Sequence, residues 1–161
     1  MGKFKTLVRA LAIPAAAASF IPFALGVCSL GVTARFHGSN INYEAYIFDA
    51  LFVILWLGTF AMSLATLLLP HWRFGIPYLI WSSLTLGFSF GYALFWSPYM
   101  RNATALKSYT GAGAADHLAF STGIIGSVLG TIPVAHAGIA AARGRKTSMV
   151  KTNQPVATTY A

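Results

Sequence analysis

Four long apolar runs separated by short polar segments dominate the pattern of this chain. The clearest run, from Tyr46 to Leu69, contains a single charged side chain, Asp49. At ~1.5 Å per residue, a helix over this run would cross a bilayer core of about 30 Å. We therefore predict a membrane-spanning helix here, and the other three runs have the same character.

The predicted fold is all-α: a four-helix transmembrane bundle with antiparallel neighbours. The four helices are predicted over about residues 7–30, 46–69, 76–96 and 117–142. Pro14 and Pro22 fall inside the first helix and predict a kink, because each proline removes a backbone hydrogen bond. Prolines are tolerated in a membrane helix because neighbouring helices provide partners for the freed backbone groups. Asp116 is a suitable N-cap for the fourth helix.

The helices form one transmembrane domain over residues 1–142. A basic and then polar tail over 143–161 is predicted to be disordered from its composition. The first apolar run has a second interpretation as a secretory signal peptide, with Val32-Thr33-Ala34 as the cleavage site. Its apolar stretch is longer than the usual core of such a peptide, which favours the spanning helix.

Charge predicts the orientation of the bundle. The chain has 11 Lys and Arg residues against 3 acidic ones, and an even number of spans puts both termini on one side. That side would carry a net positive charge from Lys3, Lys5, Arg9, Arg73, Arg143, Arg145, Lys146 and Lys151. The positive-inside rule makes this side cytosolic, where it would contact anionic lipids. This interpretation replaces nucleic-acid binding as the explanation of the basic excess.

The opposite side has balanced charge and carries the sequon Asn102-Ala103-Thr104, so Asn102 is a glycosylation candidate. We predict a polar outer-rim cluster there, consisting of Arg35, Asp49, Arg101, Asp116 and His117. Asp49 would pair with one of three basic residues, Arg35, Arg101 or Lys107. Asp49, Trp56 and Ser63 lie seven apart, and this face of helix two should turn inward, flanked by Thr59 and Thr66.

Small residues predict how the helices pack. Membrane helices associate by close backbone approach, and small side chains permit it. On the third helix we predict a packing stripe of Ser83, Gly87 and Gly91. On the fourth we predict one of Ala119, Gly123, Gly126, Ser127 and Gly130. We expect these two helices to make the tightest contact, and we expect no convergent polar cluster at the membrane midplane.

No metal or cofactor is predicted. Cys28 is the single cysteine, which excludes a Cys-based zinc site. The four histidines are candidate haem ligands, because a bis-histidine haem needs two imidazoles at matching depth: His37 would pair with His117, and His71 with His136. Hydrogen-bonded histidines at the membrane interface are the simpler interpretation. No nucleophile, phosphate-binding or dinucleotide-binding motif gives a reason to name an enzyme.

Part of helix two resembles fungal MARVEL-domain proteins, a family with four spanning helices and cytosolic termini. The similarity covers Asn42-Tyr43, Phe48-Asp49-Ala50-Leu51, Ile54-Leu55-Trp56-Leu57 and Phe60-Ala61. In that family the Asp/Trp helix is often the third, and many members have a cysteine pair in the last loop, which this chain lacks. The resemblance implies membrane organisation or vesicle traffic through lateral association, and it carries over no catalytic residue.

The sequence therefore predicts a multi-pass protein of the endomembrane system or plasma membrane. It would act as a non-enzymatic organiser, trafficking factor or accessory subunit, with other membrane proteins or a second copy as partner. The alternative is a small membrane oxidoreductase or isomerase acting on a lipophilic metabolite. Such an enzyme would use Asp49, Asp116, His117 and Trp56.

Overall fold

The computed structural model describes the backbone of residues 2–37, 43–68, 71–105 and 111–152. Within these ranges it describes the side chains of residues 6–35, 43–68, 74–101 and 113–142. Every described segment is helical. The helices are α1 (Gly2–His37), α2 (Tyr43–Leu68), α3 (His71–Ala105), α4 (Gly111–Leu129) and α5 (Thr131–Thr152).

Four stretches of these helices are long and apolar enough to cross a membrane. They are Thr6–Arg35, Tyr43–Leu68, Phe74–Arg101 and Gly113–Ala142, the last running through α4 into α5. These are the features of a multi-pass integral membrane protein, and they confirm the predicted number of spans. Both Pro14 and Pro22 lie inside α1, as expected for prolines in a membrane helix.

The helices are longer than the apolar runs, which corrects several predicted ends. The third helix continues through Pro98 to Ala105. The fourth begins at Gly111, so Asp116 lies within its second turn and is not the N-cap. At the C-terminal end, α5 continues past Ala142 to Thr152, into the segment predicted to be disordered. Apolar runs mark where the bilayer ends, whereas helices need not end there.

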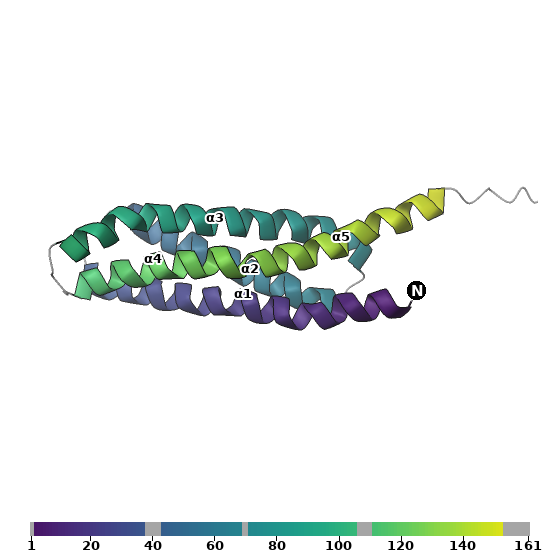
Figure 1. Ribbon diagram of the computed structural model, residues 1–161, viewed down its shortest axis with the longest axis horizontal. Coiled ribbons are helices and arrows are strands. Elements are labelled where there is room, and N and C mark those ends of the chain that lie inside the picture. The colour runs from purple at the N-terminus through teal and green to yellow at the C-terminus, as the bar shows by residue number, and fades with distance from the viewer. Residues whose placement is uncertain (1, 38–42, 69–70, 106–110, 153–161) are drawn as a thin grey trace, which may run out of the picture.

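The last span is broken at Gly130, which the sequence pattern did not predict. Pro133 lacks a backbone N–H, and its ring crowds the carbonyl of Leu129, so the helical ladder cannot continue unchanged. Two backbone bonds bridge the break: Gly130 donates to Gly126 (2.8 Å), and Val134 donates to Gly130 (3.3 Å). In Figure 1, α4 and α5 still follow one another as a single long rod.

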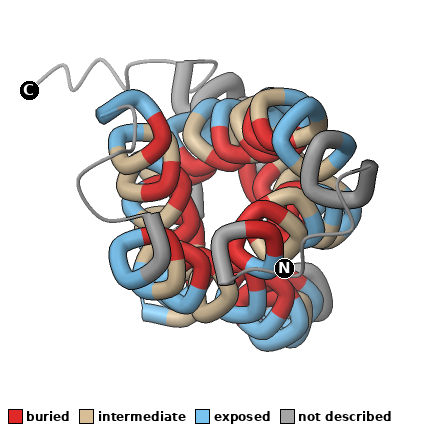
Figure 2. The backbone as a smooth tube through the Cα atoms, turned by 90° about the vertical axis from the view of Figure 1, so that its left-hand side faces the viewer, coloured by how far each residue is buried: buried red, intermediate tan, exposed pale blue. Residues whose placement is uncertain are grey.

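The helices lie lengthwise beside one another, with the start of α1 and the end of α5 towards the same end of the bundle (Figure 1). Seen end-on, the buried residues of every helix face inward and the exposed residues face outward (Figure 2). The outward residues are largely apolar, such as Ile80 (65% exposed) and Phe90 (60%). An apolar exterior is what a membrane requires, because lipid replaces water as the solvent.

Helix α3 packs closely along both α4 and α5. A Cβ atom on Gly123 of α4 would lie 2.8 Å from the backbone of Ala93. A Cβ on Gly75 of α3 would lie 2.7 Å from the backbone of Ala141. Glycine is required at both points because the helix backbones approach too closely for any side chain.

The stripe predicted on α3 does not make this contact. Ser83, Gly87 and Gly91 are exposed, and a Cβ on Gly87 or Gly91 would meet no atom within 4 Å. Spacing alone identified a face made of small residues but not the direction in which that face points. In the fourth span the predicted residues do turn inward: Ala119, Gly123, Gly126 and Gly130 are buried, and Ser127 is half-buried.

Candidate functional site

Polar side chains fill much of the bundle interior, which corrects the expectation of no convergent polar cluster. The buried set comprises Ser19, Ser29, Thr33, Asp49, Thr59, Ser63, Thr66, Ser82, Thr85, Ser89, Asp116, Thr122 and His136. Asp49 and Ser63 lie roughly 21 Å apart along α2, most of the thickness of a bilayer core. The inward face predicted for helix two is confirmed, since Asp49, Trp56, Thr59, Ser63 and Thr66 are all buried.

One end of this column is built around Asp49, whose side chain is 1% exposed. The hydroxyl of Tyr92 on α3 donates to Asp49 Oδ1 over 2.5 Å. This length is at the short end of the range for bonds from a hydroxyl to a carboxylate. Ser29 of α1 lies 3.3 Å from the same Tyr92 hydroxyl. Three helices thus converge on one carboxyl group.

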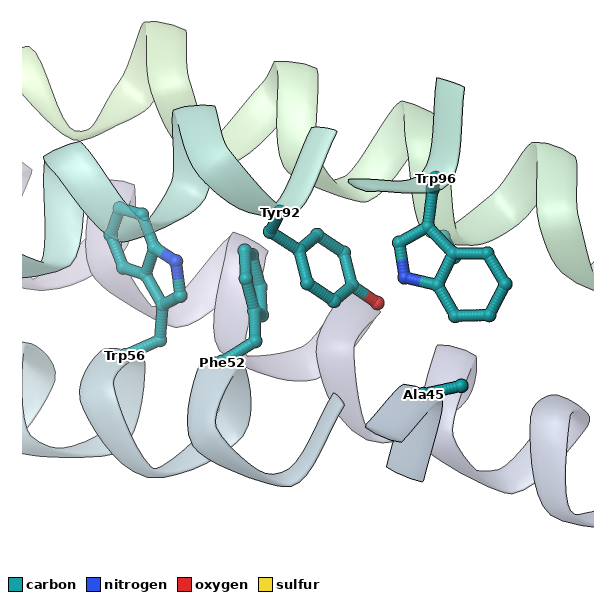
Figure 3. Close-up of a cluster of buried hydrophobic side chains, with 6 residues drawn as sticks. Ala45, Phe52, Trp56, Tyr92 and Trp96 are labelled. Atoms are coloured by element: carbon teal, nitrogen blue, oxygen red, sulfur yellow. The ribbon is translucent and has the colours of Figure 1, made fainter. Parts of the chain in front are cut away.

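Two further hydroxyl groups lie buried without a hydrogen-bond partner, Thr33 Oγ1 and Thr122 Oγ1. The buried indole of Trp96 is a polar neighbour of the Tyr92 hydroxyl. Thr33 follows Ser29 by one turn of α1, and Trp96 follows Tyr92 by one turn of α3. The rings of Tyr92 and Trp96 have centroids 6.3 Å apart. Figure 3 shows the Trp96 ring nitrogen on the side that faces the Tyr92 hydroxyl.

Thr122 brings α4 into the same region. Its neighbour one turn earlier, Ala119, belongs to a buried cluster with Tyr92 and Trp96. One turn later, a Cβ on Gly126 would lie 3.1 Å from the ring of Phe52. Thr122 is itself fully buried between these two contacts. We call Ser29, Thr33, Asp49, Tyr92, Trp96 and Thr122 the Asp49 cluster, and it draws on all four spans.

Phenylalanine side chains close the Asp49 cluster between α2 and α3. Phe48 of α2 stacks on Phe95 of α3, with centroids 4.5 Å apart and planes at 4°, and on Phe88 at 5.7 Å. All three rings are half-buried. Each precedes a buried polar or aromatic residue of the column, namely Asp49, Ser89 or Trp96. The rings therefore stand between these interior groups and the membrane-facing surface.

Two aromatic residues separate the Asp49 cluster from the rest of the column. The ring of Phe52 lies 4.5 Å from that of Tyr92, centroid to centroid, and Phe52 is fully buried. Trp56 follows one turn later and donates from Nε1 to Ser89 Oγ over 3.0 Å. Beyond Trp56, the hydroxyls of Thr59 and Thr85 are 2.9 Å apart. The polar column is thus divided into two parts.

The other part is built around His136 of α5. Its Nε2 atom donates to the Val8 carbonyl of α1 over 3.1 Å, because a carbonyl oxygen only accepts. In the neutral ring, Nδ1 then accepts from the Tyr78 hydroxyl of α3 at 3.2 Å. Ser63 of α2 lies 2.8 Å from the same hydroxyl. We call Val8, Ser63, Tyr78 and His136 the His136 cluster, one chain of hydrogen bonds that joins all four spans.

The predicted outer-rim residues differ in burial. Arg35 and Arg101 are exposed, His117 is half-buried, and Asp116 is 8% exposed on α4. The structure shows Tyr92 as a hydrogen-bond partner of Asp49. The side chains of Asn102 and Lys107 lie outside the described residues, as do those of His37 and His71.

Sequence reasoning missed the polar face of α3. Ser82, Thr85, Ser89, Tyr92 and Trp96 recur every three or four residues, which is the signal that could have revealed it. From Ser82 to Tyr92, each residue of this stripe is one or two positions from a residue of the small-residue stripe. Because an inward face in a membrane bundle is marked by polarity rather than by hydrophobicity, the polar stripe was the better guide.

The chemistry of the Asp49 cluster is that of hydrogen bonding around one carboxyl group. In the part of the chain that the structure describes, no group of three or more His, Cys, Asp or Glu residues is placed to hold a metal ion. Comparison with known proteins finds no matching family model, no curated relative and no similar solved structure.

Proposed function

We propose that this multi-pass membrane protein is a non-enzymatic organiser, trafficking factor or accessory subunit that works by lateral helix association. In this proposal it resides in the endomembrane system or plasma membrane, with antiparallel spans and both termini cytosolic. Its partner is another membrane protein or a second copy of the chain. The resemblance to MARVEL-domain proteins points the same way, since it implies lateral association without catalysis.

One observation carries this proposal: a stripe of small residues on α3 faces outward. Ser83, Gly87 and Gly91 are exposed, and space is open at the Cβ positions of both glycines. Their neighbours on the outside of α3 include Leu84 (56% exposed) and Leu94 (59%). Small residues between large apolar ones form a groove on a helix, and a second helix packs closely into such a groove in lipid.

The test is the double variant Gly87→Leu/Gly91→Leu, analysed by crosslinking in native membranes. A Cβ at either position meets no atom within 4 Å, so we expect the leucine side chains to extend into the groove on the outer face of α3. We expect the crosslinked partner or dimer to fall by about tenfold, the change produced by roughly 1.4 kcal/mol. The unfolding midpoint of the purified protein should not fall.

A matched control is Ala61→Leu, which adds the same bulk to an exposed small position on α2. It should leave the crosslinked species at the wild-type level. A double variant of α3 that retains its crosslinked partner would refute the proposal. Equal loss of crosslinking from Ala61→Leu would also refute it, because the stripe on α3 would then have no special role.

A further inference from the structure

We propose that the Asp49 cluster binds the hydroxyl end of a neutral amphiphilic molecule that enters from the membrane between α2 and α3. The molecule is defined by its chemistry: one alcohol group on an apolar body, as in a sterol or a long-chain alcohol. This binding site does not depend on lateral association through the outward face of α3.

The first argument is the set of polar atoms without partners. Buried hydrogen-bonding groups in proteins are nearly always paired, and exceptions point to a functional role or a bound molecule. Here two such atoms belong to the Asp49 cluster, Thr33 Oγ1 on α1 and Thr122 Oγ1 on α4. The His136 cluster, built in the same bundle, has a partner for each of its polar side chains. The orphaned atoms are therefore a local property of one site.

The second argument is chemical complementarity. Trp96 Nε1 only donates, while the hydroxyls of Thr33 and Thr122 both donate and accept. Asp49 adds a carboxyl group to this set. An alcohol fits because its oxygen accepts from a threonine while its proton goes to another oxygen of the cluster. An ionised fatty acid or a phosphate would bring a negative charge into a low-dielectric interior, where an unpaired charge is costly.

The third argument is the route from the bilayer. The backbones of α2 and α3 approach each other over a smaller extent than those of α1 and α2. Near Asp49 their seam is closed by the stacked rings of Phe48, Phe88 and Phe95. Rotation of these three side chains is the movement that would open the seam. The molecule stops at this level because Phe52 and Trp56 close the interior beyond it.

The experiment uses the full chain in lipid nanodiscs with two photoactivatable probes, a sterol and hexadecanol. Each is compared with its methyl ether, which keeps the acceptor oxygen but loses the proton. Labelled peptides are identified by mass spectrometry. We expect the alcohol probes, but not the ethers, to label the seam around Phe48 and Phe95. Which of the two probes labels more strongly identifies the apolar body that the site prefers.

Three conservative variants test the cluster itself: Trp96→Phe, Thr33→Val and Thr122→Val. Each removes one buried polar atom of the Asp49 cluster, and the two threonine variants also preserve the shape of the side chain. Each should reduce seam labelling several-fold, up to about tenfold, the loss expected for one buried hydrogen bond. Thr66→Val is the control, because Thr66 is buried outside the cluster and donates only to Ser63 of its own helix.

Three results would overturn the proposal. One is equal labelling by alcohols and ethers, which would indicate a hydrophobic contact only. Another is seam labelling that none of the three cluster variants reduces. The third is labelling spread evenly along the outer surface of the bundle, in which case enclosed water, not an amphiphile, would be the partner of these atoms.

Discussion

The two polar clusters of the bundle are built in the same way, but they differ in how many of their polar atoms have hydrogen-bond partners. Each pairs a tyrosine of α3 with a residue of α2: Tyr92 with Asp49, and Tyr78 with Ser63. The two tyrosines are fourteen residues apart, and so are their partners. The His136 cluster then closes through α5 onto α1, whereas the Asp49 cluster contains a carboxyl group and two hydroxyls without partners, those of Thr33 and Thr122.

This difference distinguishes polar residues that stabilise the bundle from polar residues that are candidates for binding a ligand. The chain Val8–His136–Tyr78–Ser63 spans all four helices and satisfies its members, so packing and stability are a sufficient explanation of it. The Asp49 cluster has a cost that packing does not explain, because unpartnered polar atoms oppose folding. A residue set that opposes folding is the better candidate for a binding site.

The largest expected effect comes from the variant Tyr92→Phe. It removes the donor to Asp49 Oδ1 and leaves the carboxyl group with less support in the bundle interior. A buried polar group that loses its partner costs about 1–3 kcal/mol, so we expect destabilisation of that size. The midpoint of unfolding in mixed micelles measures it. Tyr99→Phe, on an exposed residue of the same helix, should change the midpoint little.

A smaller loss is expected from Tyr78→Phe in the His136 cluster. The substitution removes a hydroxyl that bridges Ser63 and His136, both neutral groups. Hydrogen bonds between membrane helices contribute on average about 0.6 kcal/mol, so the two lost here amount to about 1 kcal/mol. If Tyr78→Phe were as damaging as Tyr92→Phe under the same unfolding conditions, the distinction between the two clusters would fail.

The smallest effect, and one of opposite sign, is expected from Thr33→Val and Thr122→Val. In delipidated protein these variants remove buried hydroxyls that have no partner, so stability should stay equal or rise by up to about 1 kcal/mol. Thermal unfolding followed by tryptophan fluorescence measures this change. A clear loss of stability in delipidated protein would mean that these hydroxyls have protein partners after all.

The sequence could predict the inward face of helix two because Asp49, Trp56 and Ser63 recur every seven residues amid apolar ones. It could not predict that Tyr92 donates to Asp49. Tyr92 lies 43 positions away, and no local pattern indicates that the two side chains meet. Both are buried in the interior. Which side chains share that interior depends on helix rotation.

The sequence by itself determined that the chain has four spans, because hydrophobic length in a bilayer is a local property of each segment. It also determined which faces were polar and which were made of small residues. Only the tertiary structure decided where each face points: the polar face of α3 inward, and Ser83, Gly87 and Gly91 outward. The physical reason is that a membrane helix is apolar on nearly every side, so its rotation is set by the neighbours it packs against and not by the solvent.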